Sequence, residues 1–341
     1  MPPTHDELRL AQTGWTQNWR ERLRELAESI RVVLHEDLTS LERDSKPLRH
    51  GAGDLTYAID EGTELVAARW MARLAATEPL SLFTEDHGWK HVSDSGSGFD
   101  HGGPRIVLDP IDGTRNLMLD LRSAWTEIAW CAAGPSEPRS TEVAASLLAE
   151  LPGERAASFR VLEAGPQGPA TLELRRVDDG ALIERRDLVA DPDDDQLEHR
   201  VLSFFRYEPR WRPLIASIEA AFFERVESHE GVDPRHCFDD QYISNAGQLA
   251  LLAMGQYRFV CDLRAFLATR QGKAAVTSKP YDLAGAVHLA RAAGCVVEAP
   301  DGTALDFPLD ATTPVSYVGY ANERIAQRLR PHLAHALAAA L

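Results

Sequence analysis

The sequence predicts an α/β protein with an α+β first half and an α/β second half. Two long helical stretches open the chain, and short apolar runs follow them. Between residues 135 and 195, strand-like segments alternate with Gly-Pro turns, which is typical of antiparallel strands. The last third alternates helical and strand-like segments, as in a sheet covered by helices. The 341 residues suffice for two units, which we expect at 1–195 and 196–341.

Two helices are expected before residue 80. From 6 to 38, apolar side chains such as Trp19, Leu23 and Leu26 recur at three- and four-residue steps, the spacing of one helix face. The segment 60–76 has a similar pattern. Its expected buried side chains are Leu65, Ala68, Trp70 and Leu74.

Short apolar runs predict buried strands between these helices and the C-terminal third. The run 80–83 ends abruptly in TEDHG, and the run 105–108 ends in DPIDGT. The stretch 123–132 is long enough for a buried strand. SFRVLEA and ATLELRRV are the antiparallel candidates within 135–195.

The C-terminal third predicts helices and strands in alternation. Such alternation favours a sheet with helices packed on it. The expected helices are 213–227, 244–254, 281–293 and 321–341, and the expected strands are 257–261, 295–298 and 315–319.

The charge balance argues against two classes of partner. The chain has 36 basic and 52 acidic residues, a net charge of −16. A general nucleic-acid or anionic-membrane binder needs a basic surface, so we expect neither partner. A small anionic ligand remains compatible, because a bound metal ion inverts the local field.

Four cysteines stand far apart with no CxxC pair, which predicts buried free thiols rather than disulfides or a zinc site. The first residues show no signal-peptide pattern. The longest uncharged stretch, 243–257, is too short to span a bilayer. We therefore expect a cytoplasmic protein.

The most informative pattern is VLDPIDGTRN at 107–116. A turn at the end of a strand would place Asp109 and Asp112 on the same side, with the Ile111 carbonyl pointing inward. Two carboxylates and a carbonyl form a set of hard oxygen ligands, which suits Mg²⁺ rather than Zn²⁺.

The next two residues of the same string predict an anion site. Gly113 permits backbone conformations that other residues avoid. If a helix starts at Thr114, its first N–H groups face an anion. The alternative for either Asp-Pro or Asp-Gly alone is an ordinary turn with a helix cap.

As a whole, the string resembles the DPIDGTxNF signature of the inositol monophosphatase family of magnesium-dependent, lithium-sensitive phosphatases. Leu117 stands where the family has an aromatic residue. The family also carries an acidic pair after a short upstream strand. SLFTED at 81–86 is similar, with Glu85 matching the metal-binding glutamate and Asp86 replacing the second acid.

Two further segments carry the resemblance. KPYDLAG at 279–285 is similar to the family's Trp-Asp motif, with Asp282 matching the metal-binding aspartate and Tyr281 replacing tryptophan. DLTYAID at 54–60 is similar to DLVTxxD, and Asp60 matches its last residue. Each acid taken alone could be a helix cap.

The resemblance implies a layered αβαβα sandwich of the inositol monophosphatase/fructose-1,6-bisphosphatase type, usually a homodimer. It implies two or three Mg²⁺ ions, the third and weaker one near Asp86. The ligands implied for the two main ions are Glu85, Asp109 and the Ile111 carbonyl on one, and Asp109, Asp112 and Asp282 on the other.

The same resemblance implies roles in hydrolysis. Glu85 and a Thr114–Asp60 pair would help to remove a proton from the attacking water. The backbone of Gly113 and Thr114 would bind the substrate phosphate. We therefore expect a Mg²⁺-dependent phosphomonoesterase acting on a small polyol, sugar or nucleotide phosphate.

The substrate is left open by the sequence. Inositol-specific members place a glutamate seven residues before the downstream Asp, where this chain has Ala275. Arg264, Arg270, Lys273 and Lys279 lie nearby, either as a solvated face or as a second-phosphate subsite. The alternatives are therefore a 3′(2′),5′-bisphosphate nucleotidase, a fructose-1,6-bisphosphatase, or a non-catalytic scaffold.

Overall fold

The computed structural model describes residues 14–40, 48–50, 55–92 and 98–341. Its larger sheet has eight strands in the order β10-β9-β8-β7-β6-β5-β3-β4. β3 and β5 are parallel, and the other neighbours are antiparallel. The strands are β3 (Leu80–Thr84), β4 (Gly88–Val92), β5 (Arg105–Asp112), β6 (Ala124–Cys131), β7 (Val143–Leu151), β8 (Ser158–Ala164), β9 (Ala170–Arg176) and β10 (Leu182–Leu188).

These strands confirm the sequence prediction for most of the first half. The runs 80–83, 105–108 and 123–132 are β3, β5 and β6, and every residue of these three strands is buried. The segments SFRVLEA and ATLELRRV are the antiparallel strands β8 and β9, as predicted. The neighbouring strands β7 and β10 were not named by the sequence prediction. The sequence did not predict β4, whose side chains are mostly half-buried at the edge of the sheet.

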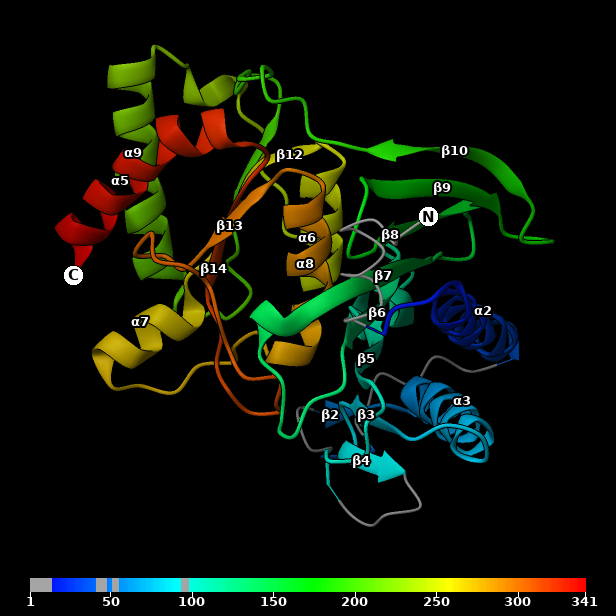
Figure 1. Ribbon diagram of the computed structural model, residues 1–341. Coiled ribbons are helices and arrows are strands. Elements are labelled where there is room, and N and C mark those ends of the chain that lie inside the picture. Colours follow the sequence, from blue (N-terminus) through cyan, green and yellow to red (C-terminus); the bar gives the residue numbers. More distant parts are fainter. Residues whose placement is uncertain (1–13, 41–47, 51–54, 93–97) are drawn as a thin grey trace, which may run out of the picture.

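Helices α2 (Gln17–Ser40) and α3 (Ala58–Ala75) lie side by side on one face of this sheet (Figure 1). Residues 6–13 of the first expected helix lie outside the described residues. In α3, Trp70 and Leu74 are buried as predicted. The prediction was wrong for Leu65 and Ala68, which are exposed. The buried face follows Ile59, Thr63, Ala67, Trp70, Met71 and Leu74.

A second sheet of four strands has the order β11-β12-β14-β13. β11 (Val201–Phe204) is parallel to β12 (Tyr257–Asp262), and β14 (Tyr317–Tyr320) is antiparallel to both β12 and β13 (Val296–Glu298). The sequence predicted the last three strands. It did not predict β11, which has only four residues.

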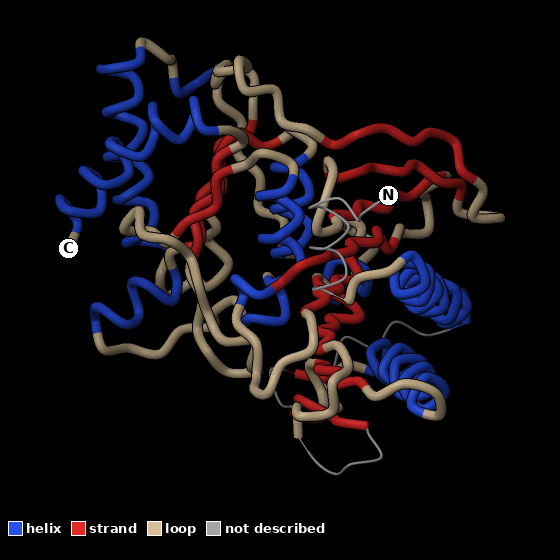
Figure 2. Tube along the Cα trace, in the orientation of Figure 1, coloured by secondary structure: helices blue, strands red, loops and turns tan. Residues whose placement is uncertain are grey.

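Helices α6 (Asn245–Ala253) and α8 (Ala284–Ala292) fill the space between the two sheets, as Figures 1 and 2 show. α5 (Arg212–Glu230) and α9 (Glu323–Ala340) pack together on the outer face of the smaller sheet. The layers therefore run αβαβα, which confirms the expected sandwich. The sequence did not predict α7 (Arg264–Gln271), which lies at one end of the smaller sheet.

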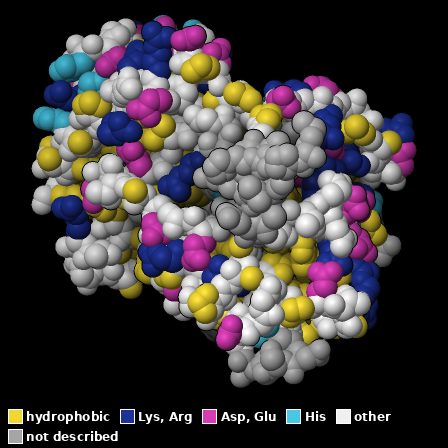
Figure 3. All heavy atoms as spheres, viewed as in Figure 1, with side chains coloured by type: hydrophobic (Ala, Val, Ile, Leu, Met, Phe, Trp, Pro, Cys, Tyr) yellow, Lys and Arg dark blue, Asp and Glu magenta, His cyan; other side chains and the backbone are white. Residues whose placement is uncertain are grey.

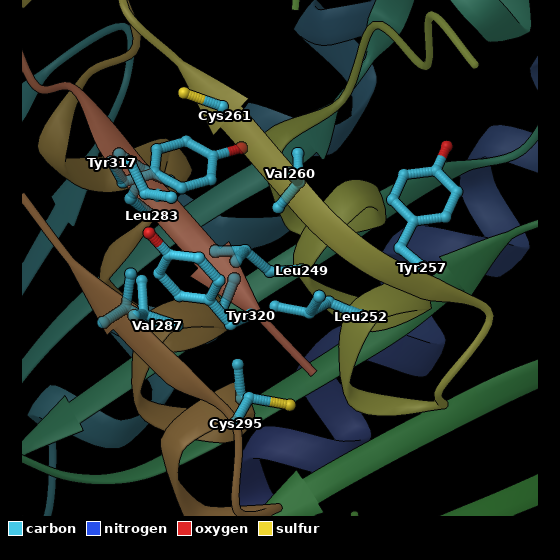
Figure 4. Close-up of a cluster of buried hydrophobic side chains, with 14 of the residues drawn as sticks. Leu249, Leu252, Tyr257, Val260, Cys261, Leu283, Val287, Cys295, Tyr317 and Tyr320 are labelled. Carbon is cyan, nitrogen blue, oxygen red and sulfur yellow. The ribbon is translucent and has the colours of Figure 1, made fainter. Parts of the chain in front are cut away.

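The middle helices join the two sheets through a buried apolar core. Leu249 and Leu252 of α6 and Val287 of α8 lie against Val260 and Tyr320 of the smaller sheet (Figure 4). Since α8 also packs on β6 and β7, this layer holds the two sheets at a fixed spacing. The division into units at 1–195 and 196–341 stays a prediction.

The remaining sequence predictions concern thiols and surface. All four cysteines are free, and Cys131, Cys261 and Cys295 are buried as expected. Among the described residues, none of the helices combines the length and apolar character that a bilayer crossing requires. On the described part of the face in Figure 3, acidic and basic side chains are interspersed.

Candidate active site

One pocket is lined by acids that are far apart in sequence. Asp109 and Asp112 stand at the end of β5, and Glu85 follows β3. Because β3 and β5 are parallel neighbours, their carboxyl ends meet at one edge of the sheet. Asp282 reaches the same pocket from the 3₁₀ turn Pro280–Asp282, just before α8. The pocket has a volume of about 90 Å³.

The turn after β5 depends on Gly113. This residue has φ +93°, in the left-handed region, and precedes the short helix α4 (Thr114–Met118). A Cβ atom here would lie 2.9 Å from Asn116 Nδ2 and 3.0 Å from Ser244 Cβ. The expected helix start at Thr114 is therefore present, and the turn also fits closely against the start of α6.

Inside this turn, local hydrogen bonds orient two of the expected ligands. The N–H of Ile111 donates to Asp109 Oδ1 at 2.9 Å. The Ile111 carbonyl accepts from Thr114 Oγ1 at 2.9 Å. Asp109, Ile111 and Asp112 all line the pocket, as the turn geometry predicted.

Asp112 is held by the start of α6. Its Oδ2 accepts from Ser244 Oγ at 2.7 Å and from the N–H of Ala246 at 2.6 Å. Burial raises the pKa of Asp112 to about 6, although these hydrogen bonds act to lower it. The carboxylate is therefore fixed by contacts that join the two halves of the molecule.

The segments that carry Glu85 and Asp282 are in contact through Tyr281. Tyr281 donates to Glu85 Oε1 at 3.2 Å, and its ring stacks on Phe83 of β3. Asp282 Oδ2 accepts from the N–H of Lys279 at 3.0 Å and from Asn245 Nδ2 at 3.3 Å. Tyr281, which replaces the tryptophan of the resembled motif, thus links the two acidic segments.

The Thr114–Asp60 contact is longer than a typical hydrogen bond. Thr114 Oγ1 lies 3.4 Å from Asp60 Oδ1, and the hydroxyl has a closer acceptor in the Ile111 carbonyl. Burial, with a contribution from the charge of Asp86, raises the pKa of Asp60 to about 7. Asp54, the first residue of the resembled DLVTxxD segment, lies outside the described residues.

The acids repel one another. Burial raises the pKa of Asp109 well above its usual range, and the charges of Glu85, Asp112, Asp282 and Glu127 add to the shift. All the donor atoms are hard oxygens, which fit a divalent cation such as Mg²⁺. In the described part of the chain, however, no three His, Cys, Asp or Glu side chains form a ready-made metal cluster.

Sequence reasoning missed several residues of this site. Ser244 and Asn245 had an available signal, since a Ser before a helical run is an N-cap candidate. Glu127 also had one, as the single acid of the buried strand AWTEIAWC. Tyr57 and Tyr207 had none, because their rings flank Arg115 in the pocket, at 5.8 and 5.6 Å, only after folding.

The four cations suggested as an anion subsite do not converge. Arg264 lines the pocket, but it is buried and paired with Asp262 at 2.6 Å. Lys279 lines the pocket and donates to the Thr312 carbonyl at 3.3 Å. Arg270 and Lys273 do not line it. The second-phosphate interpretation therefore loses its main support.

The chain was compared with known protein families, curated proteins and solved structures. No family model matches the chain, and no curated protein matches it. Among solved structures, the Thermotoga maritima inositol monophosphatase has a TM-score of 0.61 at 16% identity, covering 95% of this chain and 100% of that one. The extragenic suppressor protein SuhB from Bartonella henselae has a TM-score of 0.62 at 16% identity, covering 93% and 98%.

A Pyrococcus horikoshii protein described as similar to inositol-1 monophosphatase gives the same result, with a TM-score of 0.62 at 16% identity over 93% of this chain and 99% of that one. These identities are low, and the coverage of both chains is nearly complete. The resemblance that the motifs predicted is therefore confirmed in the fold: this chain shares the layered fold of the inositol monophosphatases.

Proposed function

We propose that this chain is a Mg²⁺-dependent phosphomonoesterase acting on a small polyol, sugar or nucleotide phosphate. The observation that carries the proposal is the pocket in which Glu85, Asp109, Asp112 and Asp282 lie together. Buried acids that face one another are costly unless cations neutralise them. A phosphate monoester carries about two negative charges, and its hydrolysis is very slow without such neutralisation.

Glu85, Asp109, Asp112, Asp282 and the Ile111 carbonyl would hold two Mg²⁺ ions, with a third near Asp86. Bound there, the ions would neutralise phosphoryl charge and lower the pKa of water. The first N–H groups of a helix have no helical acceptor, so those of Gly113 and Thr114 would donate to the phosphate.

The chain also offers acceptors for the proton of the attacking water. Asp60, with a pKa raised to about 7, is suited to take up a proton near neutral pH. Thr114 lines the pocket, and its Oγ1 could pass the proton on to Asp60, 3.4 Å away, if it turned away from the Ile111 carbonyl. Glu85 is the second candidate acceptor.

The ligands bound by one structural neighbour guide the choice of substrates. Structures of an enzyme named SaIMPase-II, with TM-scores of 0.58 and 0.57, contain inositol monophosphate and 2′-AMP. Those ligands belong to that protein. They support including both a polyol phosphate and a nucleotide in the test. No observation favours a bisphosphate, because the four cations do not converge.

Measuring phosphate release from a substrate panel tests the proposal. The panel contains inositol monophosphate, 2′-AMP, fructose 1,6-bisphosphate and a nucleoside 3′,5′-bisphosphate, each with Mg²⁺ and with EDTA. We expect release from at least one monoester with Mg²⁺ and none with EDTA. No release from any ester would favour a scaffold.

We also propose that the chain forms a homodimer, which light scattering tests. The cytoplasmic location stays a prediction.

A further inference from the structure

Glu127 is a buried acid that lies beside the pocket. It lies on β6 directly opposite Asp109 of β5, so both side chains lie on the same face of the sheet. Its exposed fraction is 1%. A carboxyl group in a fully buried strand is costly unless it makes specific contacts.

Those contacts are with the first turn of α8. Glu127 Oε1 accepts from the N–H of Gly285 at 2.7 Å and from the N–H of Ala286 at 3.2 Å. The residue before this helix, Leu283, supplies no side-chain cap. A helix start leaves several N–H groups without partners, and an oxygen acceptor placed there satisfies them. Glu127 therefore caps α8 from the neighbouring sheet.

The backbones of β6 and α8 also approach each other closely at Gly285. A Cβ atom on Gly285 would lie 2.8 Å from the Ile128 carbonyl oxygen, so only glycine fits there without a shift. Asp282 stands three residues before this point. Its Oδ2 accepts from the N–H of Lys279 and from Asn245 Nδ2, both of which lie outside α8. The carboxylate of Asp282 stays directed to the pocket while Glu127 holds the helix behind it.

We propose that Glu127 is a positioning residue for the cation site formed by Glu85, Asp109, Asp112 and Asp282. Its Oε1 fixes the start of α8, and with it Asp282, relative to the strand that carries Asp109. This inference rests on the proposed function. Glu127 Oε2 is buried and makes no hydrogen bond within the described part of the chain, so the role depends on the acceptor at Oε1.

Two conservative variants test the position of the acceptor. Glu127→Gln keeps an oxygen at the position of Oε1, whereas Glu127→Asp withdraws that oxygen by one methylene. Calorimetric titration of the metal-free, full-length protein with Mg²⁺ gives the dissociation constant. We expect Glu127→Asp to weaken binding at least about tenfold, as for other residues that orient ligands, and Glu127→Gln to stay within about threefold.

A matched control separates positioning from stability. Glu150 is another buried acid of the same sheet, and it accepts from Ser123 and Arg160 away from the pocket. We expect Glu150→Gln to leave the Mg²⁺ dissociation constant unchanged, even where the melting temperature without Mg²⁺ falls. A role confined to stability would make Glu127→Asp behave in the same way, and that result would overturn the inference.

A double-mutant cycle tests the route through Asp282. If Glu127 acts by placing Asp282, then adding Glu127→Asp to Asp282→Asn causes little further loss of Mg²⁺ affinity. Full additivity would contradict the proposed route, and so would equal losses in Glu127→Gln and Glu127→Asp. Wild-type protein that neither binds Mg²⁺ nor releases phosphate would instead refute the proposed function itself, and the inference with it.

Discussion

The two sides of the pocket are built differently. The turn side, residues 109–114, is one short segment whose shape follows from its own backbone and local hydrogen bonds. The far side is assembled from separate segments around Ser244, Lys279 and Asp282. The difference shows that Asp109 and Asp112 are placed together mainly by local sequence, whereas the position of Asp282 relative to them depends on packing between distant segments.

The largest effect is expected on the turn side. Asp112→Asn keeps an oxygen for Ser244 and the N–H of Ala246, so the fold should persist. The variant loses a charge that faces the proposed cations, and phosphate release should fall at least about 100-fold. Asp187→Asn, on the exposed strand β10, is the control and should keep full activity. Wild-type rates in Asp112→Asn would show that the reaction does not use this turn.

A second prediction concerns the contact between the two sides. Gly113→Ala forces a left-handed conformation and places a methyl group 3.0 Å from Ser244 Cβ. Gly168→Ala is the matched control, because φ is +77° and no atom lies within 4 Å of the added methyl. The strain alone costs about 1–3 kcal/mol. We expect a clearly larger drop in melting temperature for Gly113→Ala; equal drops would mean that the close fit to α6 contributes nothing.

The third prediction is a pH dependence. The pKa of Asp60 is raised from 3.8 to about 7, so between these values the folded state keeps a proton that the unfolded state has released. This group therefore lowers the free energy of unfolding as pH rises from about 4 to about 7. In EDTA, Asp60→Asn should gain stability relative to wild type across that window, with no difference near pH 4. Denaturant unfolding measures it, and a pH-independent difference would contradict it.

The smallest effects are expected among the cations of the far side. Lys279 lines the pocket, so Lys279→Ala should raise KM roughly two- to fivefold, the size of a partly exposed charge contact. Arg270→Ala and Lys273→Ala should leave KM unchanged, because neither residue lines the pocket. A selective rise in KM for a bisphosphate in either variant would restore the second-phosphate subsite.

Local patterns predicted much of the fold. Strands β3, β5 and β6 were predicted because each is a buried apolar run that ends at a turn. Strand β11 was missed, although β13 and β14, which are no longer than β11, were predicted. In α3, the exposed Leu65 shows that one apolar residue on a helix says little about which face is buried.

The contacts on the far side of the pocket were not predicted, for a different reason. Arg264 was grouped with surface cations, yet it is buried, because Asp262 pairs with it and Ser278 accepts a hydrogen bond from it. Glu127 was passed over, although it is the acid that caps α8. In both cases the residue type was visible, but its partner could be identified only in the folded chain.

The sequence by itself determined the turn from Asp109 to Thr114, since proline, glycine and nearby donors constrain a short backbone segment regardless of its surroundings. The order of helical and strand-like runs predicted a sheet covered by helices, and the resemblance of the motifs implied the layered sandwich. Only the tertiary structure decided which side chains face the acids and how Asp282 stands relative to Asp109. Those distances follow from the packing of α6 and α8 between two sheets, the sum of many weak contacts that no short segment encodes.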